Sequence, residues 1–365
     1  MENKLYGTRL YVDYRSINHN FNFLKKKINN SKVVVMVKAN AYGHGDLQFT
    51  QYLESIGISH FAVADFEEGV RLRNAGVRGS IMVMNPGVNN LETIIENDLE
   101  PVIYNKMILS QMNSIIYKSS KKRVRIHIKF NTGMNRWGFN IEDTSYLINT
   151  ISKNQNLVIG SIYSHFASVS DIEEDLFSQK QIDVLLNIGQ QFFRGFKYNI
   201  DIHISNSAMI LRDFHLEAFS CFRVGLLLYG GVDHPSLVPV SELKCPISDI
   251  RIVDIGDTIG YQRKYIVKQQ KKIAIIPFGY ADGLQRSWGE GKLRFYYQGQ
   301  LIPTIGLISM DSCVLDITNI KDISIGDEVF YFGKKRPIWE LAKELDTIPY
   351  EIMASLSRRI KRIYS

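Results

Sequence analysis

The sequence predicts an α/β protein with an N-terminal (β/α)8 barrel of the TIM type and a C-terminal domain built mostly of β-strands. Three observations lead to this prediction: short apolar runs alternate with helical stretches, the pattern changes near residue 236, and the chain has 365 residues. A chain of that length is long for one domain and comfortable for two. We therefore expect a barrel over residues 10–236 and a mostly-β domain over residues 237–365, which an N-terminal strand at residues 1–9 joins.

The first part of the chain contains short runs rich in Val and Ile with polar or glycine-bearing ends. This pattern is typical of strands that are buried on both faces of a parallel sheet. Seven such runs are Val33–Val37, Phe61–Ala64, Ile81–Met84, Pro101–Ile103, Arg125–Phe130, Leu157–Tyr163 and Asp201–Ile204, and we expect an eighth at Phe222–Leu228. The intervening amphipathic stretches include Leu47–Ile56, Phe66–Ala75, Leu91–Glu96 and Ile172–Phe193. Because these units repeat so often, they favour a closed barrel over an open sheet.

After residue 236 the runs are shorter and are separated by glycines and turn signals, which indicates antiparallel strands. The main runs are Ile250–Val253, Ile273–Ile276, Leu293–Tyr297, Leu301–Ile305 and Val314–Ile317. Their spacing suggests a small barrel or a sandwich. Two helices are expected in this part, at Ile338–Leu345 and Tyr350–Ser357.

The composition is that of a soluble globular protein, with 45% hydrophobic and 22% charged residues. The three cysteines are widely spaced without a CxxC pair, which argues against disulfides and a zinc site and fits a reducing cytoplasm. We therefore expect no metal. The chain shows no leader pattern and no apolar run long enough to cross a bilayer, so neither secretion nor a membrane is expected. The net charge of +7 comes without a nucleic-acid-binding motif, so nucleic acid is not an expected partner.

The most informative residue is Lys38, which ends the apolar strand at Val33–Val37. Parallel barrels open their active sites at the carboxyl ends of their strands. Burial at that position lowers the pKa of a lysine and makes its amine available as a nucleophile or base. The residues that follow, Ala39-Asn40-Ala41-Tyr42-Gly43-His44-Gly45, complete a motif that resembles the cofactor-binding motif of alanine racemases. The resemblance implies that Lys38 binds pyridoxal 5'-phosphate covalently and that Tyr42 binds the cofactor phosphate.

The resemblance continues in order along nearly the whole chain. It covers segments 126–138 (IHIKFNTGMNRWG), 164–167 (SHFA), 203–208 (HISNSA), 223–226 (RVGL), 256–261 (GDTIGY), 279–283 (GYADG) and 309–311 (SMD). It implies the following roles: a carbamylated lysine at Lys129, a substrate-binding arginine at Arg136, a histidine beside the pyridine ring at His165, a phosphate ligand at Ser207, an arginine at the pyridine nitrogen at Arg223, and phosphate-binding amides at Gly225 and Leu226.

Arg223 discriminates best between related functions. Pyridoxal enzymes that need a strong electron sink place a carboxylate at the ring nitrogen and keep that nitrogen protonated. An arginine is permanently charged and only donates hydrogen bonds, so it leaves the nitrogen unprotonated. Delocalisation into the ring is then weaker, and simple return of the proton is favoured. Arg223 therefore favours a racemase over a decarboxylase of the same fold.

Racemisation needs one proton-transfer group on each face of the substrate Cα. Lys38 can serve one face, and the resemblance assigns the other to Tyr261. In the family this tyrosine arrives from the partner subunit, together with a backbone N–H at Met310 that meets the substrate carboxylate. The resemblance therefore implies a homodimer with shared active sites, which interconverts L-alanine and D-alanine and supplies D-alanine for peptidoglycan.

Two positions depart from the family pattern. Asn131 stands where many members carry Asp, which removes a charge close to Lys129 and Arg136. Arg358 stands where some members carry a tyrosine that touches the phosphate. Because Arg358 could line the substrate pocket differently, the sequence leaves open a racemase of another amino acid such as serine. It also leaves open a decarboxylase of the same fold and a non-catalytic pyridoxal-phosphate-binding protein.

Overall fold

A computed structural model describes residues 7–118 and 123–365. Its contacts divide the chain into two compact units. The barrel unit comprises Asn22–Ala39 and Asp46–Gly225. The β unit comprises Asn40–Gly45 and Leu226–Ser365, together with the N-terminal segment that ends at Phe21. The domain bounds expected at 10–236 and 237–365 stay a prediction.

The barrel unit contains an eight-stranded parallel sheet, as the sequence predicts. Its strands are β2 (Lys32–Met36), β3 (His60–Val63), β4 (Ser80–Val83), β5 (Glu100–Ile103), β6 (Val124–Lys129), β7 (Leu157–Tyr163), β8 (Asp201–His203) and β9 (Cys221–Val224). They follow the order β8-β7-β6-β5-β4-β3-β2-β9, and every hydrogen-bonded pair is parallel. The end strands β8 and β9 pack against each other without forming a ladder between the described residues, so the sheet is nearly closed into a barrel.

The eighth strand is shorter than predicted. Strand β9 ends at Val224, whereas the prediction ran on to Leu228. The apolar residues Leu226–Tyr229 are buried in turns instead, where Gly230 and Gly231 donate their N–H groups to the carbonyls of Leu227 and Leu226. An apolar run has the same composition in a buried strand and in a buried turn, so the pattern could not separate them.

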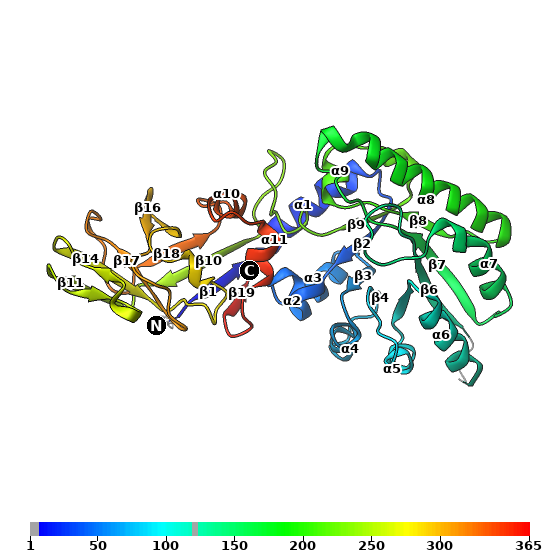
Figure 1. The fold of residues 1–365 in the computed structure, drawn as a ribbon, viewed down its shortest axis with the longest axis horizontal. Helices are drawn as coiled ribbons and strands as arrows, with labels where there is room; N and C mark the ends of the chain where they lie inside the picture. The colour runs from blue at the N-terminus through cyan, green and yellow to red at the C-terminus, as the bar shows by residue number, and fades with distance from the viewer. Residues whose placement is uncertain (1–6, 119–122) are drawn as a thin grey trace. The chain divides into compact units, whose positions relative to one another are not determined.

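Helices lie outside the strands of the barrel unit (Figure 1). They are α3 (Asp46–Ser55), α4 (Phe66–Asn74), α5 (Leu91–Glu96), α6 (Lys106–Lys118), α7 (Thr144–Ser152), α8 (Asp175–Gly195) and α9 (Ser207–Leu211), with 3-10 turns η1 (Ile141–Asp143), η2 (Ile172–Glu174) and η3 (Leu216–Ala218). The longest, α8, buries one face through residues that include Ile182, Leu185 and Phe192. The inward faces of the strands pack into one cluster that contains Val34, Ala62, Met82, Val102, Tyr163 and Cys221. Two further helices, α1 (Tyr14–Lys27) and α2 (Lys38–Tyr42), cross the bounds of the units.

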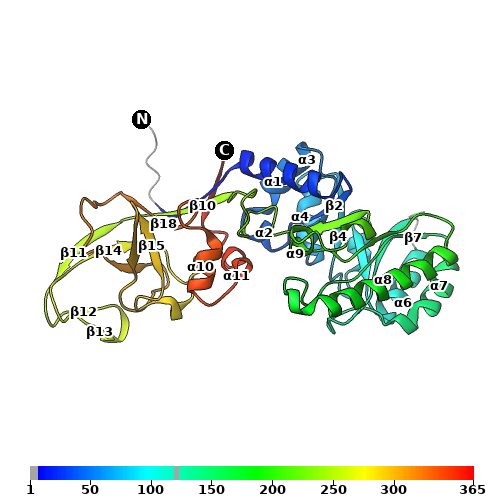
Figure 2. The same ribbon diagram turned by 90° about the horizontal axis from the view of Figure 1, so that it is seen from above.

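The β unit is mostly β-structure, as predicted. A six-stranded sheet has the order β16-β15-β18-β10-β1-β19, a three-stranded sheet has the order β11-β14-β17, and β12 pairs with β13. The strands are β1 (Arg9–Val12), β10 (Ser241–Pro246), β11 (Asp249–Val253), β12 (Thr258–Ile259), β13 (Tyr265–Ile266), β14 (Lys271–Ile276), β15 (Arg294–Tyr297), β16 (Gln300–Pro303), β17 (Cys313–Asp316), β18 (Glu328–Phe332) and β19 (Lys361–Tyr364). The helices are α10 (Ile338–Glu344) and α11 (Pro349–Ala354), with turns η4 (Tyr261–Arg263) and η5 (Arg286–Trp288). Figure 2 shows the β12–β13 pair at one edge of this unit.

The prediction of an N-terminal strand at residues 1–9 can be compared with the structure only from residue 7 onward. Residues 1–6 of the expected strand 1–9 lie outside the described residues, and the observed strand β1 covers Arg9–Val12. Strand β1 pairs antiparallel with β10 and parallel with β19, so it lies inside the six-stranded sheet. The alternation of buried Leu10 and Val12 with the less buried Arg9 and Tyr11 fits a strand of which one face meets a core.

The described part of the chain has no helix that is long and apolar enough to cross a bilayer. Cys221, Cys245 and Cys313 are all buried, and their thiols are free.

Candidate active site

Lys38 follows strand β2 at the carboxyl end of the barrel strands, where the sequence placed it. Burial lowers the pKa of its amine, and the positive charges of Arg136 and Arg223 lower it further, against the opposing charge of Glu68. A lysine with a lowered pKa is a better nucleophile and base near neutral pH than an exposed one.

The backbone after Lys38 forms a left-handed turn. The φ angles of Ala39, Asn40, Ala41 and Tyr42 lie between 50° and 56°. Each residue other than glycine costs roughly 1–2 kcal/mol in this conformation. Such strain persists only where surrounding contacts hold it, and it gathers at functional sites.

Glu68 provides one of these contacts from helix α4. Its carboxylate accepts the N–H of Ala39 at 2.6 Å and the N–H of Ala64 at 2.8 Å. The same helix begins with Asp65 as its N-cap, whose carboxylate accepts the N–H of Glu68. Glu68 therefore ties the first residue after Lys38 to the end of strand β3. Sequence reasoning missed this residue because a glutamate in the first turn of a helix is common.

Three more cations share the carboxyl end of the barrel with Lys38. Lys129 ends strand β6, and its side chain is almost completely buried. Burial lowers the pKa of Lys129 to about 8, with further lowering by Arg136, Arg223 and Lys38. The amine lies 5.5 Å from the ring centroid of Trp137, and the Arg136 guanidinium lies 6.0 Å from the same ring. Arg136 itself is exposed.

Arg223 lies in strand β9 and is 3% exposed. Its Nη1 donates to Nδ1 of His203 and to the carbonyl of His203. Its Nη2 donates to the carbonyls of Ser164 at 2.8 Å and Ile204 at 3.2 Å and to Nδ1 of His165 at 3.1 Å. These contacts use the terminal N–H groups, and among the described residues the Nε–H has no acceptor. Burial lowers the pKa of Arg223 to about 10, so the guanidinium stays charged near neutral pH.

His165 follows strand β7, and its ring is neutral. Burial lowers its pKa to about 3, and the charges of Arg223, Arg136, Lys129 and Lys38 contribute. Because the arginine N–H can only donate, Nδ1 of His165 must accept, and the ring proton is on Nε2. The ring therefore presents a hydrogen-bond donor on its other side.

Two further predicted residues of the barrel unit lie near the ends of its last strands. Ser207 is buried and begins helix α9, whose N-cap Asn206 accepts the N–H of Met209. Gly225 directly follows strand β9, two residues after Arg223.

The other predicted residues belong to the β unit. Tyr42 is buried, with its ring 4.7 Å from that of Tyr229 and 5.6 Å from that of Tyr350. Burial raises the pKa of its phenol, so Tyr42 is a neutral hydrogen-bonding group. Leu226 is buried in the turn after Gly225.

Tyr261 and Met310 are large side chains that this unit leaves at its surface, 65% and 52% exposed. Tyr261 begins the turn η4 after Gly260. The segment that carries Met310 is fixed by Arg359, which donates to Asp311 at 2.8 Å and to Asp282 at 2.6 Å.

Tyr163 and His203 are the other residues that sequence reasoning missed. The Arg223 guanidinium lies 4.9 Å from the centroid of the Tyr163 ring, and the rings of Tyr163 and His203 stack at 5.2 Å. The alternation of side chains between the two faces of strand β7 could have identified Tyr163 as a residue that points into the barrel, but the residues around Tyr163 form no motif that indicates a function.

Comparison of the sequence with known protein families assigns the chain to a family. The sequence model of the alanine racemase N-terminal domain matches residues 12–233, and that of the alanine racemase C-terminal domain matches residues 240–364. The chain belongs to the alanine racemase family. The alanine racemase of Clostridium novyi is 34% identical over 371 residues, which cover 97% of this chain and 94% of that protein.

Solved alanine racemase structures agree with this fold. The alanine racemase of Clostridium difficile 630 matches with a TM-score of 0.90 and 28% identity, over 99% of this chain and 96% of that chain. The alanine racemase of Bartonella henselae, with covalently bound pyridoxal phosphate, matches with a TM-score of 0.88 and 27% identity, over 99% of this chain and all (100%) of that chain. The chain is thus an isomerase, an alanine racemase by family, and the family in general depends on pyridoxal phosphate.

Proposed function

We propose that this alanine racemase binds pyridoxal 5'-phosphate through Lys38, that it is a homodimer, and that Lys38 and the partner subunit's Tyr261 exchange the α-proton of alanine on opposite faces. The observation that carries the proposal is the buried Arg223, held by His165 and His203, whose Nε–H has no acceptor among the described residues. The product, D-alanine, serves peptidoglycan synthesis.

The residues of the barrel unit fit the cofactor. The positive charges of Arg136 and Arg223 lower the pKa of both Lys38 and Lys129, and the carboxylate of Glu68 raises that of Lys38. Such a cluster of positive charge, of which Lys129 and Arg223 are buried, fits anionic ligands, which a cofactor phosphate and a substrate carboxylate supply. The Nε–H of Arg223 can donate to a further acceptor, and a pyridine nitrogen is one.

Pyridoxal phosphate, when bound, supplies an electron sink that acidifies the α-proton of an amino acid. Arg223 keeps its charge near neutral pH, so it donates to the ring nitrogen and does not give up a proton. A weaker electron sink favours return of the proton over loss of the substrate carboxylate. This residue therefore supports racemisation over decarboxylation.

The lowered pKa of Lys38 lets its amine accept the α-proton on one face of the substrate. On the other face the partner subunit's Tyr261 acts. The Nε2–H of His165 provides the donor that stabilises the phenolate form, because Nδ1 already accepts from Arg223. The hydrogen bonds from the partner subunit's Tyr261 to His165 and on to Arg223 thus connect the second base to the same guanidinium that meets the pyridine nitrogen of the cofactor.

The substrate carboxylate is held by the guanidinium fork of Arg136 and the backbone N–H of the partner subunit's Met310. The cofactor phosphate is held by the hydroxyls of Tyr42 and Ser207 and the backbone N–H groups of Gly225 and Leu226. We further propose that the enzyme works in the cytoplasm, because three buried free thiols fit a reducing compartment.

Incubation of the holoenzyme with L-alanine, L-serine and L-lysine, followed by chiral chromatography, tests the reaction. We expect D-alanine as the main product, together with visible absorbance of the lysine-bound cofactor that borohydride removes. D-serine as the main product would overturn alanine as the substrate. If no D-amino acid forms from any of the three, the protein is a non-catalytic cofactor-binding protein.

Two inactive variants test the shared site. Lys38→Ala and Tyr261→Phe homodimers should both be inactive, but subunit exchange between them creates hybrid dimers that keep one intact site. With free exchange of equal amounts, about one quarter of all sites should regain activity. If Lys38 and Tyr261 of the same subunit worked together, mixing would restore nothing.

A further inference from the structure

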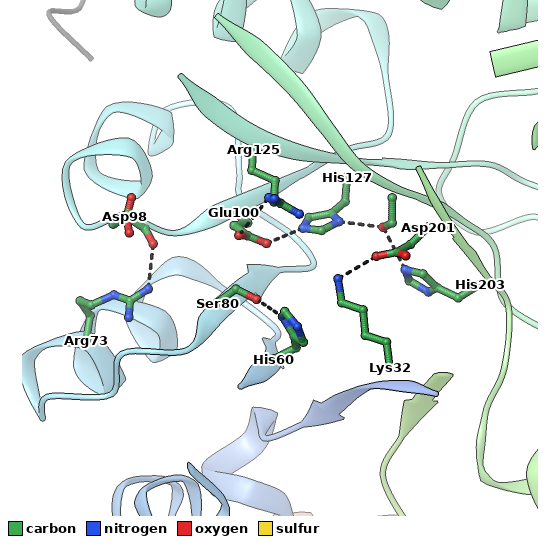
Figure 3. A network of polar contacts seen from close by, with 11 residues as sticks. Lys32, His60, Arg73, Ser80, Asp98, Glu100, Arg125, His127, Asp201 and His203 are labelled. Carbon is green, nitrogen blue, oxygen red and sulfur yellow. Dashed lines mark hydrogen bonds and ion pairs between the residues drawn. The ribbon is translucent and has the colours of Figure 1, made fainter. Parts of the chain in front are cut away.

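A chain of four hydrogen bonds runs through the interior of the barrel from Arg223 to Glu100. Arg223 Nη1 bonds to Nδ1 of His203, and Nε2 of His203 lies 2.9 Å from Oγ of Ser161. That hydroxyl lies 2.7 Å from Nδ1 of His127, whose Nε2 lies 2.9 Å from a carboxylate oxygen of Glu100. Figure 3 shows His127 between Glu100 and His203.

The strand register builds this chain. In parallel strands β6 and β7, His127 lies directly beside Ser161, and in β7 and β8, Tyr163 lies beside His203. His127, Ser161 and His203 are all buried. Glu100 begins strand β5, at the end of the barrel opposite to Lys38, and helps to line a cavity of about 190 Å³ there. The chain therefore connects the site residue Arg223 with the amino-terminal end of the barrel.

All four bonds must point the same way. Arg223 can only donate, so Nδ1 of His203 accepts and its proton is on Nε2. That proton is donated to Ser161, whose own proton is donated to Nδ1 of His127. His127 consequently carries its ring proton on Nε2 and donates it to the Glu100 carboxylate.

The charges at the two ends agree with this direction. Burial alone would raise the pKa of Glu100, but the hydrogen bond and charge of His127 and the charge of Arg125 outweigh it and leave that pKa lowered. Burial and the charge of Arg223 hold the pKa of His203 well below its usual range, so this ring is neutral. The chain thus begins at the Arg223 cation and ends at the Glu100 carboxylate, and the His203 ring next to the arginine is neutral.

We propose that Glu100, His127 and Ser161 are positioning residues for the racemase reaction, which hold the Nε2 side of the His203 ring in place, keep its Nδ1 lone pair toward Arg223 and thereby fix the orientation of the guanidinium. This inference rests on the proposed role of Arg223 at the cofactor nitrogen. His203 holds Nη1 only while its Nδ1 lone pair faces the arginine. The other tautomer of His203 would point its Nδ1–H at the guanidinium and displace it. The Nε–H of Arg223 would then no longer point toward the cofactor nitrogen.

Ser161→Ala is the central test, because it removes the hydroxyl between the two histidines and changes little volume. Ser80→Ala is the matched control. Ser80 bonds to His60 at 2.6 Å at the same end of the barrel and takes no part in the chain that ends at Arg223. Because His203 and His127 both lose their hydrogen-bond partner, we expect kcat of Ser161→Ala to fall about tenfold. The KM for alanine should change less than about twofold, because Ser161 does not touch the substrate. Ser80→Ala should keep both constants.

Ring nitrogen NMR gives a readout that does not depend on activity. In the wild-type enzyme, with and without cofactor, His127 and His203 should both carry their proton on Nε2. In Ser161→Ala their ring signals should shift, whereas those of His60 should shift only in Ser80→Ala. A proton on Nδ1 of His127 or His203 in the wild-type enzyme would overturn the proposal.

Glu100 provides a conservative rescue. Glu100→Gln keeps an oxygen that can accept from His127, so its kcat should stay closer to wild type than that of Glu100→Leu. Equal losses in both variants, at equal thermal stability, would contradict a positioning role. So would equal effects of Ser161→Ala and Ser80→Ala.

Arg223→Lys separates this proposal from the function on which it rests. If Arg223 acts at the cofactor, Arg223→Lys alone lowers kcat strongly. Adding Ser161→Ala should then lower kcat little further, because the hydrogen-bond chain no longer has a guanidinium to orient. If Arg223→Lys leaves kcat unchanged, the proposed role of Arg223 fails. If the kcat losses of Arg223→Lys and Ser161→Ala simply multiply in the double variant, the proposed role of Arg223 stands, but the proposed action of the hydrogen-bond chain on Arg223 is wrong.

Discussion

Lys129 should carry a carbamate in the working enzyme. The pKa of its amine in the structure gives the fraction that is neutral and able to react. Its pKa of about 8 lies about 2.5 units below the ordinary value of 10.5. At neutral pH about one tenth of the amine is then neutral, roughly 300 times the fraction of an ordinary lysine. A neutral amine attacks carbon dioxide, forms the N–C bond and releases one proton to water. The product is an anion at the position where Lys38, Arg136 and Arg223 disfavour a cation.

Isotope-labelled bicarbonate, read by carbonyl NMR and by intact mass, measures the modification. At neutral pH one carbamate should form per chain in the wild type and none in Lys129→Arg. At a fixed concentration of dissolved carbon dioxide, occupancy should rise with pH until every chain is modified, because the reaction consumes a neutral amine and releases a proton. The rise should be steeper below the Lys129 pKa of about 8, where the neutral fraction of the amine also grows with pH. Lys271 is an internal control, because its bond to Asp316 raises the pKa of its amine.

Arg136→Gln tests the physical reason. Removing this cation raises the pKa of the Lys129 amine and removes a partner of the carbamate, so both effects lower the occupancy. Unmodified Lys129 in wild-type enzyme at neutral pH, in buffer replete with bicarbonate, would refute the reasoning. Unchanged occupancy in Arg136→Gln would show that Arg136 does not contribute to the activation of the amine.

Three further changes should give clear outcomes. Arg358→Tyr should alter the alanine-to-serine ratio of kcat/KM if this exposed arginine reaches the substrate pocket, and an unchanged ratio would exclude it from specificity. Gly43→Ala should lower the free energy of unfolding by at least about 3 kcal/mol, as measured by denaturant titration, since φ is +77° and the new Cβ would lie 2.0 Å from the carbonyl oxygen of Met353. Ala39→Val should unfold more easily than Ala39→Gly by about 1–2 kcal/mol, because Ala39 has a φ of 52°; equal stabilities would show that the turn is not strained.

The barrel was predictable because its strands are buried on both faces. Runs of Val and Ile at Val33–Val37 and Leu157–Tyr163 give a signal that needs no knowledge of tertiary contacts, and the observed strands lie within a residue of them. The end of strand β9 was not predictable, because Leu226–Tyr229 is equally apolar in a turn. Strand β1 begins at Arg9, the last residue of the stretch predicted at 1–9, and its pairing with β10 and β19 extends it to Val12.

The candidate site divides in the same way. Lys38 was predictable from its place at a strand end and from its motif. Glu68 was not predictable, because its role depends on the left-handed turn at Ala39, and no local sequence pattern indicates that turn. Ser161 and His127 were not either, because they become neighbours only through the register of two strands.

Arg223 also occupies the one junction of the barrel where two neighbouring strands, β8 and β9, share no ladder in the described part of the chain. Its guanidinium bonds to the backbone of His203 and Ile204, and its own N–H is accepted by Ser205 at 2.9 Å. The residue that we propose donates to the cofactor nitrogen therefore also holds strands β8 and β9 together. A carboxylate at this position would remove these contacts between the two strands at the same time as the proposed contact with the cofactor. New reactions on this scaffold should accordingly arise first by changes around the substrate, with Arg223 left in place.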